Sequence, residues 1–230
     1  MNDAAAIAAN IARIRERIAA AVARRGPGPE PVLIGAAKTQ PIAAIQAAIA
    51  AGLGDVGENY AQELRDKVTA IGRDPPRWHF IGALQRNKVK LVVGQAALIH
   101  TVDRPALVEA IGARAAALGV IQEVLVEVNL AGEAQKAGAR EADLPALLDA
   151  FAAAPALRCR GLMIIPPGEE PGRSYFARLR ELRDRLAASP RPGIALDHLS
   201  MGMSGDFEAA IEEGATMVRV GTAIFGARAP

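Results

Sequence analysis

The sequence LSMGMSGDFE spans residues 199–208, and TMVRVGTAIFGAR follows at residues 216–228. Each segment reads as a short apolar strand that ends in a glycine-containing turn rich in hydroxyl and backbone N–H donors. Two adjacent loops of this kind can hold a phosphate group. The loops after the last two strands of a (β/α)8 barrel commonly hold one, so this pair predicts both a fold and a ligand. Two ordinary strand-to-helix turns are the alternative interpretation.

Short apolar strands alternate with helical segments along the rest of the chain. Strands are expected at residues 32–38, 54–58, 78–82, 98–102, 123–128, 160–164, 195–199 and 217–221. Alanine- and leucine-rich segments with helical spacing lie at 42–51, 105–118, 141–153 and 175–188. This alternation predicts an α/β fold, a single (β/α)8 TIM-type barrel domain over residues 1–230. A doubly wound open sheet is the alternative, but it normally has fewer repeats.

A helix precedes the first strand. Ile7, Ile11, Ile14 and Ile18 are spaced by four, three and four residues, which places them on one face of an amphipathic helix. A Gly-Pro-Gly-Pro segment then ends this helix. We expect the helix within residues 1–26 to pack on the outside of the barrel or to close its lower end.

Composition narrows the class of protein. The 230 residues include 27 basic and 25 acidic ones, and the basic residues form no single block, so nothing favours a nucleic-acid partner. No run approaches the roughly 20 apolar residues of a membrane span, and the N-terminus has no apolar signal core. The single cysteine, Cys159, lies in an apolar strand and reads as a core residue. We therefore expect a cytoplasmic protein without a membrane partner.

Lys38 follows the first apolar stretch directly. It shares side-chain parity with Ile34 and Ala36, so a strand that continues to residue 38 would point it into the mouth of the barrel. An ammonium group among apolar groups loses stability, and the neutral amine is a nucleophile. Above a phosphate site, such an amine predicts a ligand with both an aldehyde and a phosphate. The alternative is a loop lysine with its charge in water.

Arg219 lies inside the last expected strand, where a guanidinium without a partner is costly. It must either reach an acidic neighbour in the barrel or donate to a bound ligand. Beside the nitrogen of a pyridine ring, a charged arginine would keep that nitrogen unprotonated and would weaken the ring as an electron acceptor.

Other polar residues also fall at expected strand ends, where barrel enzymes place their functional groups. They are Glu58, Asn59, His100, Asp103, Glu127, Asn129 and His198. His79 lies within an apolar strand, and we interpret it as a core or supporting histidine rather than a catalytic one. The three histidines and Cys159 lack the spacing of metal ligands, so no metal is expected.

Six segments resemble the pyridoxal phosphate homeostasis protein family. They are AKT (37–39), GENYAQE (57–63), WHFIGALQRNK (78–88), GLMIIP (161–166), LSMGMS (199–204) and MVRVGTAIFGAR (217–228). They occur in the family's order over nearly the whole chain, although Ala83 and Arg86 replace its usual proline and hydroxyl residue. The resemblance implies a barrel similar to the N-terminal domain of alanine racemase, with pyridoxal 5′-phosphate (PLP) as the cofactor.

The same resemblance assigns roles to residues of this chain. It implies that Lys38 carries PLP as a Schiff base and that Arg219 faces the pyridine nitrogen. The phosphate is then expected in the loop from Ser200 to Ser204 and at the Gly-Thr pair of the last motif; which of the two serines touches it stays open. The full set expected at the cofactor is Lys38, Asn59, His79, Ser200, Met201, Ser204, Arg219, Gly221 and Thr222.

Three functions fit these residues. The resemblance implies a PLP carrier that acts in PLP homeostasis with little or no turnover. A PLP-dependent amino-acid racemase is the alternative, but it needs an acid or base on each face of the substrate adduct. In alanine racemase the second one is a tyrosine from another domain across a dimer, which we do not expect here; we predict a non-catalytic monomer. The third is a phosphate-binding barrel enzyme without PLP, in which Lys38 acts as a base or forms a Schiff base with a sugar phosphate.

Overall fold

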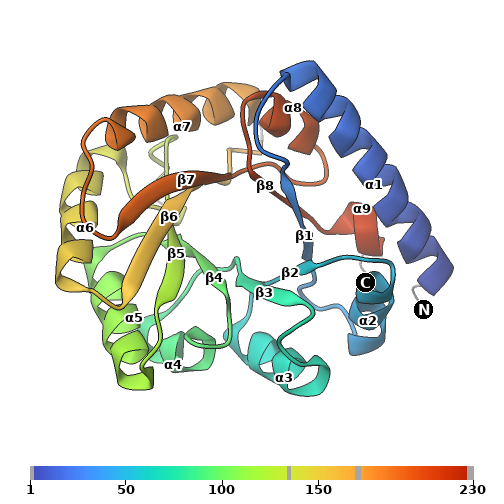
Figure 1. Ribbon diagram of the computed structural model, residues 1–230, viewed down its shortest axis with the longest axis horizontal. Helices are drawn as coiled ribbons and strands as arrows, with labels where there is room; N and C mark the ends of the chain where they lie inside the picture. Colours follow the sequence, from blue (N-terminus) through green and yellow to red (C-terminus); the bar gives the residue numbers. More distant parts are fainter. Residues whose placement is uncertain (1–2, 134–135, 169–171, 227–230) are drawn as a thin grey trace.

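A computed structural model describes residues 3–133, 136–168 and 172–226. Within these ranges, eight parallel strands pair in chain order and close into a barrel (Figure 1). The barrel closes where Ile34 pairs with Arg219. The strands are β1 (Val32–Ala36), β2 (Asp55–Glu58), β3 (Arg77–Phe80), β4 (Leu98–Val102), β5 (Gln122–Glu127), β6 (Leu157–Met163), β7 (Ile194–Ser200) and β8 (Met217–Val220). The predicted fold class and all eight strand positions are confirmed.

Helices surround the barrel. They are α1 (Ala4–Arg25), α2 (Ile42–Ala50), α3 (Ala61–Ile71), α4 (Val89–Val92), α5 (Pro105–Leu118), α6 (Leu144–Ala150), α7 (Gly172–Ala187), α8 (Phe207–Glu212) and α9 (Thr222–Phe225). The helix expected at 141–153 is shorter than predicted, because 3-10 turns at Glu141–Asp143 and Phe151–Ala153 flank α6. The end of the last motif, at residues 227–228, lies outside the described residues. No helix in the described part of the chain is both long and apolar enough to cross a bilayer.

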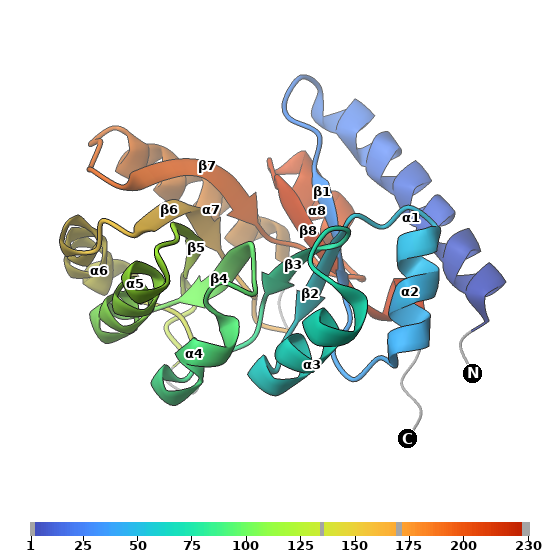
Figure 2. The same cartoon turned by 60° about the horizontal axis from the view of Figure 1, so that its bottom comes forward.

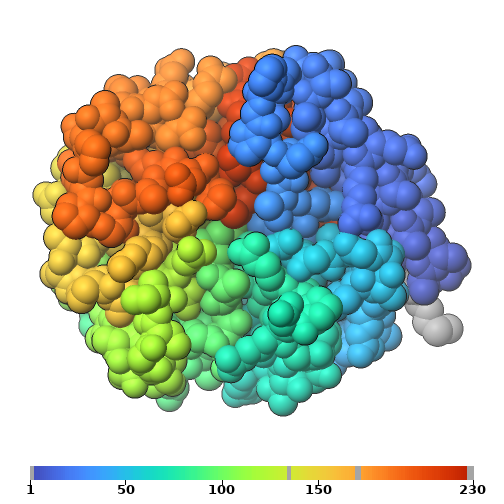
Figure 3. Space-filling model, viewed as in Figure 1, coloured from blue at the N-terminus to red at the C-terminus, as the bar shows by residue number. Residues whose placement is uncertain are grey.

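The N-terminal helix α1 lies on the outside of the barrel. This is one of the two placements predicted from the sequence, the other being at the lower end of the barrel. It packs against α2, α8 and α9 (Figures 1 and 2), and it runs along one edge of the molecule in the space-filling view (Figure 3). Ile7, Ile11, Ile14 and Ile18 are all buried in this contact. The isoleucine spacing read from the sequence therefore identifies the face that packs.

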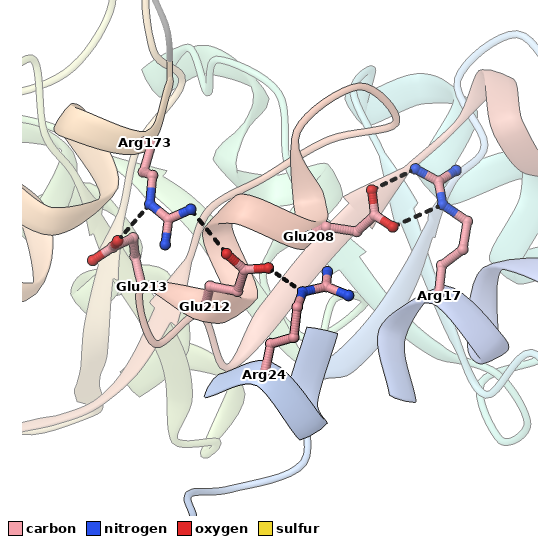
Figure 4. A network of polar contacts seen from close by, with 6 residues as sticks. All are labelled: Arg17, Arg24, Arg173, Glu208, Glu212 and Glu213. Atoms are coloured by element: carbon pink, nitrogen blue, oxygen red, sulfur yellow. Dashed lines mark hydrogen bonds and ion pairs between the residues drawn. The ribbon is translucent and has the colours of Figure 1, made fainter. Parts of the chain in front are cut away.

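Charged side chains border this contact (Figure 4). Arg17 on α1 holds Glu208 on α8 with two hydrogen bonds of 3.1 and 2.8 Å. Arg24 bonds to Glu212 at 2.6 Å, and Arg173 on α7 bonds to the same carboxylate at 2.9 Å. Because these side chains are partly exposed, each pair contributes roughly 0–1 kcal/mol, and their main effect is to set how α1, α7 and α8 are aligned.

The interior of the barrel is filled in two parts. Ile34, Leu98, Leu125, Met163 and Met217 form a small apolar cluster. Because side chains alternate along a strand, the residues two positions further on also face inward, and several of these are polar: His100, Glu127 and Arg219. The apolar part packs the barrel, and the polar part lies toward the carboxyl ends of the strands.

Candidate functional site

A cavity of about 290 Å³ opens at the carboxyl ends of β1, β2, β7 and β8. We call it the Lys38 cavity. Its polar lining comes from Lys38, Gln40, Asn59, Ser204, Arg219 and Thr222, together with the backbone of Gly205, Gly221 and Gly226. Its apolar lining comes from Ala36, Ile81, Ile165 and Met203. An amine, a guanidinium and a hydroxyl-rich loop thus converge on one space with apolar walls.

Lys38 reaches this cavity from a turn. β1 ends at Ala36, two residues earlier than predicted, and Thr39 adopts a φ of 63°, a left-handed conformation that ends the strand. The Ala37 N–H still donates to the Gly57 carbonyl at 2.8 Å, so the chain follows the sheet as far as the residue before the lysine. The amine therefore lies in the barrel mouth although it is not on the strand.

An ion network under the Lys38 turn fixes the backbone on both sides of the lysine. The Lys67 ammonium on α3 is buried, pairs with the Glu58 carboxylate and donates to the Ala37 carbonyl at 2.9 Å. Lys67 also pairs with Glu63 at 2.8 Å, and that carboxylate accepts the Thr39 N–H at 3.0 Å. Burial raises the pKa of Glu58, and the pairing with Lys67 opposes this rise. The segment GENYAQE therefore contributes its acidic residues to the shape of the site.

We expect Lys67→Met to destabilise the fold by about 3–5 kcal/mol, since it would leave Glu58 as a buried charge without its partner. Urea unfolding measures the loss. The double variant Lys67→Met/Glu58→Gln removes both charges and should recover part of it. A single variant within about 1 kcal/mol of wild type would show that the network is not a structural anchor.

The loop from Ser200 to Ser204 is fixed against the end of β8. Gly202 has a φ of 91° and lies so close to α8 that a Cβ would come within 2.6 Å of the Ala210 methyl carbon, so this turn requires glycine. Its carbonyl accepts the Arg219 N–H at 3.0 Å. The Ser204 hydroxyl accepts the N–H groups of Gly221 and Ala223 at 3.3 and 3.4 Å. The two loops predicted from sequence are therefore in contact, with Ser204 between them.

Arg219 is buried and enters the Lys38 cavity from β8. Its Nη1 donates to the Ser200 hydroxyl at 2.6 Å, and its Nη2 donates to the Ile164 carbonyl at 2.9 Å. Burial lowers the pKa of Arg219 to about 10, so the guanidinium stays charged at neutral pH. From the sequence, Arg219 was expected either to reach an acidic neighbour or to donate to a ligand. In the structure its hydrogen-bond partners are a hydroxyl and a carbonyl, and its side chain also lines the cavity.

A chain of hydrogen bonds runs from Arg219 across the barrel interior. Ser200 contacts His100 Nδ1 at 2.9 Å, His100 Nε2 contacts His79 Nδ1 at 3.0 Å, and His79 Nε2 contacts the Asp55 carboxylate at 2.8 Å. Since a guanidinium only donates and a carboxylate only accepts, two neutral imidazoles satisfy the whole chain in one direction. Burial holds the pKa of His100 well below its usual range, which agrees with a neutral ring. The chain fixes the position of the Arg219 guanidinium.

The structure thus sorts the expected cofactor residues into two groups. Six of them line the Lys38 cavity: Lys38, Asn59, Ser204, Arg219, Gly221 and Thr222. The other three lie beneath it. His79 and Ser200 belong to the buried chain, and the Met201 side chain is in the hydrophobic core. Ser204 is therefore the serine that faces the cavity.

Sequence reasoning missed two residues that are connected with this site. Asp55 was not singled out, although a carboxylate at the start of a buried strand is a signal that it has a partner. Glu127 was noted at a strand end but not placed at a site, and it lines a second cavity beside the first. The described residues contain no cluster of side chains that could hold a metal ion. Cys159 is fully buried, and burial raises the pKa of its thiol to about 11, which makes it unreactive.

Comparison with known proteins places these features in a family. The family model for the alanine racemase N-terminal domain matches residues 3–229. The pyridoxal phosphate homeostasis protein of Aquifex aeolicus is 46% identical over 222 residues, which cover 95% of this chain and 96% of the relative. The protein of the same name from Pseudomonas aeruginosa is 46% identical, with 96% of both chains covered.

This chain belongs to the pyridoxal phosphate homeostasis protein family. The fold of this chain is also similar to that of a solved structure. The structure of PipY from Synechococcus elongatus with PLP bound is 35% identical in sequence and superposes with a TM-score of 0.84. The match covers 96% of this chain and 100% of the PipY chain. The resemblance read from the six motifs is confirmed, and residues of these motifs line the Lys38 cavity.

Proposed function

We propose that this protein binds PLP in the Lys38 cavity, through a covalent bond between the Lys38 amine and the cofactor aldehyde, and acts in PLP homeostasis. The observation that carries the proposal is the convergence of three groups on one cavity: the Lys38 amine, the Ser204 and Thr222 loops, and the buried Arg219 guanidinium. Membership of a family whose relatives are named for PLP homeostasis supports it, as does the PLP-bound structure of PipY.

The cavity fits the parts of PLP one by one. The Ser204 and Thr222 hydroxyls, which both line the cavity, supply donors for a phosphate, and the contact between the two loops keeps these donors together. Ile81, Ile165 and Met203 supply apolar walls for an aromatic ring. Asn59 adds a side-chain amide to the lining of the same cavity. The donor set therefore matches an aldehyde-bearing aromatic phosphate better than a sugar phosphate, which would need more polar walls.

When bound, PLP supplies an aldehyde that captures primary amines and a pyridine ring that can accept electron density. Arg219 would limit the second capacity if its guanidinium met the ring nitrogen, since a charged guanidinium there would keep that nitrogen unprotonated. The buried chain through Ser200 and His100 holds the guanidinium in place. The protein is thus built to retain PLP, and its residues do little to activate it for chemistry at an α-carbon.

A PLP-dependent amino-acid racemase is the second candidate. Within the described residues, the ionisable side chains that line the Lys38 cavity are Lys38 and Arg219. Racemisation needs a proton donor and a proton acceptor on opposite faces, and a charged guanidinium serves as neither. Lys38 alone can move a proton on one face, which allows slow exchange without efficient inversion. The carrier function is therefore the one we adopt.

We expect no substantial turnover of D- or L-alanine by the PLP-loaded protein. Incubation in deuterated water, with exchange at the α-carbon followed by NMR and the enantiomer ratio by chiral chromatography, measures both events. Slow exchange without inversion is the expected result. Inversion at roughly 10 s⁻¹, a typical enzymatic rate, would identify a racemase instead.

The absorbance spectrum of the purified protein is the direct test of PLP binding. An imine band that borohydride abolishes would support the proposal, and its absence after incubation with PLP would contradict it. The cytoplasmic location, the monomeric state and the absence of nucleic-acid and membrane partners stay predictions.

A further inference from the structure

A second cavity, of about 230 Å³, lies beside the Lys38 cavity at the carboxyl ends of β3 to β6. The two cavities share Asn59, Ile81 and Ile165 in their linings. We call the second one the Glu127 cavity. Its walls are mainly apolar, with contributions from Ala83, Val128, Leu130, Ala131, Ala137, Ile164 and Pro167. A cavity of this size and lining suits a ligand with a short aliphatic chain.

Glu127 is the distinctive group in this cavity. It is the last residue of β5, it is only 5% exposed, and it lines the cavity. None of the described residues donates a hydrogen bond to its carboxylate. A buried carboxylate without a donor is costly, so the group is expected to meet a positively charged donor or to take up a proton.

The cations near Glu127 make hydrogen bonds or ion pairs with other groups. Arg219 directs its two Nη atoms to Ser200 and to the Ile164 carbonyl. Lys136, which lines the same cavity, pairs with Glu133 at 2.8 Å. Burial and the nearby Asp103 carboxylate raise the pKa of Glu127 to about 7, and Arg219 opposes this rise. The local balance of charge therefore favours an added cation.

Two neutral polar side chains of this cavity, those of Asn129 and Thr101, are engaged as well. The Asn129 amide donates to the Glu133 carbonyl at 2.9 Å and accepts the Gly132 N–H at 2.9 Å, which orders the loop after β5. The Thr101 hydroxyl donates to the Gly82 carbonyl at 2.6 Å. These contacts shape the cavity wall, and Glu127 adds to it a carboxylate that accepts no hydrogen bond from the described residues.

We propose that the Glu127 cavity binds a small aliphatic primary amine, with the ammonium group on the Glu127 carboxylate and the carbon chain against the apolar wall. A neutral alcohol of the same length would gain only the apolar contact, and a carboxylate ligand would meet like charge. The proposal goes beyond PLP binding and needs no cofactor. The bound amine would lie in the Glu127 cavity, next to the Lys38 cavity that Lys38 lines with its own amine.

The test is calorimetry on the full chain without PLP, with n-butylamine, putrescine, L-alanine, 1-butanol and butyrate as probes. We expect n-butylamine to bind, and Glu127→Gln, which keeps the size of the side chain, to weaken it at least about tenfold. Putrescine and L-alanine report whether a second charged group on the amine is accepted. The variant Glu30→Gln alters an exposed acid and should leave the affinity unchanged.

Two further readouts locate the effect. Backbone NMR shifts on addition of n-butylamine should centre on Thr101, Val128 and Leu130, and Glu127→Gln should reduce them. Because the pKa of Glu127 is about 7, the affinity of wild type should rise between pH 6 and pH 8, and that of the variant should not. Equal affinity for n-butylamine and 1-butanol, or for wild type and Glu127→Gln, would overturn the proposal. PLP binding in the Lys38 cavity is measured separately, by absorbance. The amine-binding proposal and the PLP-binding proposal can therefore fail independently of each other.

Discussion

Borohydride reduction of the PLP-loaded protein should place a pyridoxyl group on Lys38, and the Lys38→Ala variant should lose this covalent attachment. The amine lies in the cavity mouth, where the ion network through Lys67 fixes the backbone on both sides of it. The variant should still bind some PLP, because the proposed phosphate donors lie in the loops after β7 and β8 and do not depend on the β1 turn. Peptide mass spectrometry and the absorbance spectrum measure the two effects.

Lys90→Ala is the matched control for this experiment, since Lys90 is exposed on α4 and lines neither cavity. It should retain the full imine band. A pyridoxyl group found on Lys88 or Lys136 of the wild-type protein, with Lys38 unmodified, would show that the cavity has been assigned to the wrong amine.

Pyridoxal, which lacks the phosphate, should bind far more weakly than PLP. Hydrogen bonds to a charged group contribute about 1.5–3 kcal/mol each, so two such contacts at Ser204 and the Gly221–Thr222 turn correspond to roughly 10²–10⁴-fold in affinity. Competition between the two ligands, followed by the imine absorbance, measures the ratio. Equal affinities would show that these loops do not hold the phosphate.

Ser204→Ala should narrow this gap by about tenfold, since it removes one donor and also the contacts that hold Gly221 and Ala223. The affinity for pyridoxal should stay unchanged. Ser189→Ala, at an exposed serine after α7, is the control and should change neither affinity.

Local patterns in the sequence predicted the elements of this fold well. Alternating apolar strands and alanine-rich helices follow from backbone periodicity, which is a property of neighbouring residues. The isoleucine spacing of α1 identified its packed face for the same reason, and the outward packing was one of the two predicted placements. The errors were at boundaries. β1 stops before Lys38 because Thr39 turns the chain, and a positive φ at a threonine has no signal in sequence.

The sequence alone determined that this is an eight-stranded barrel of a recognisable family, and that Lys38, Arg219 and two donor-rich loops belong to its candidate site. Tertiary structure decided which serine faces the cavity. Ser200 and Ser204 are four residues apart in the same loop, and only the turn at Gly202 directs one to the interior and the other to the mouth. The tertiary structure also brought Asp55, His79 and His100 into one chain of hydrogen bonds. It left the Glu127 carboxylate without a hydrogen-bond donor among the described residues. These residues come from different strands, and their contacts depend on how the closed barrel sets neighbouring strands in register, which no local pattern encodes.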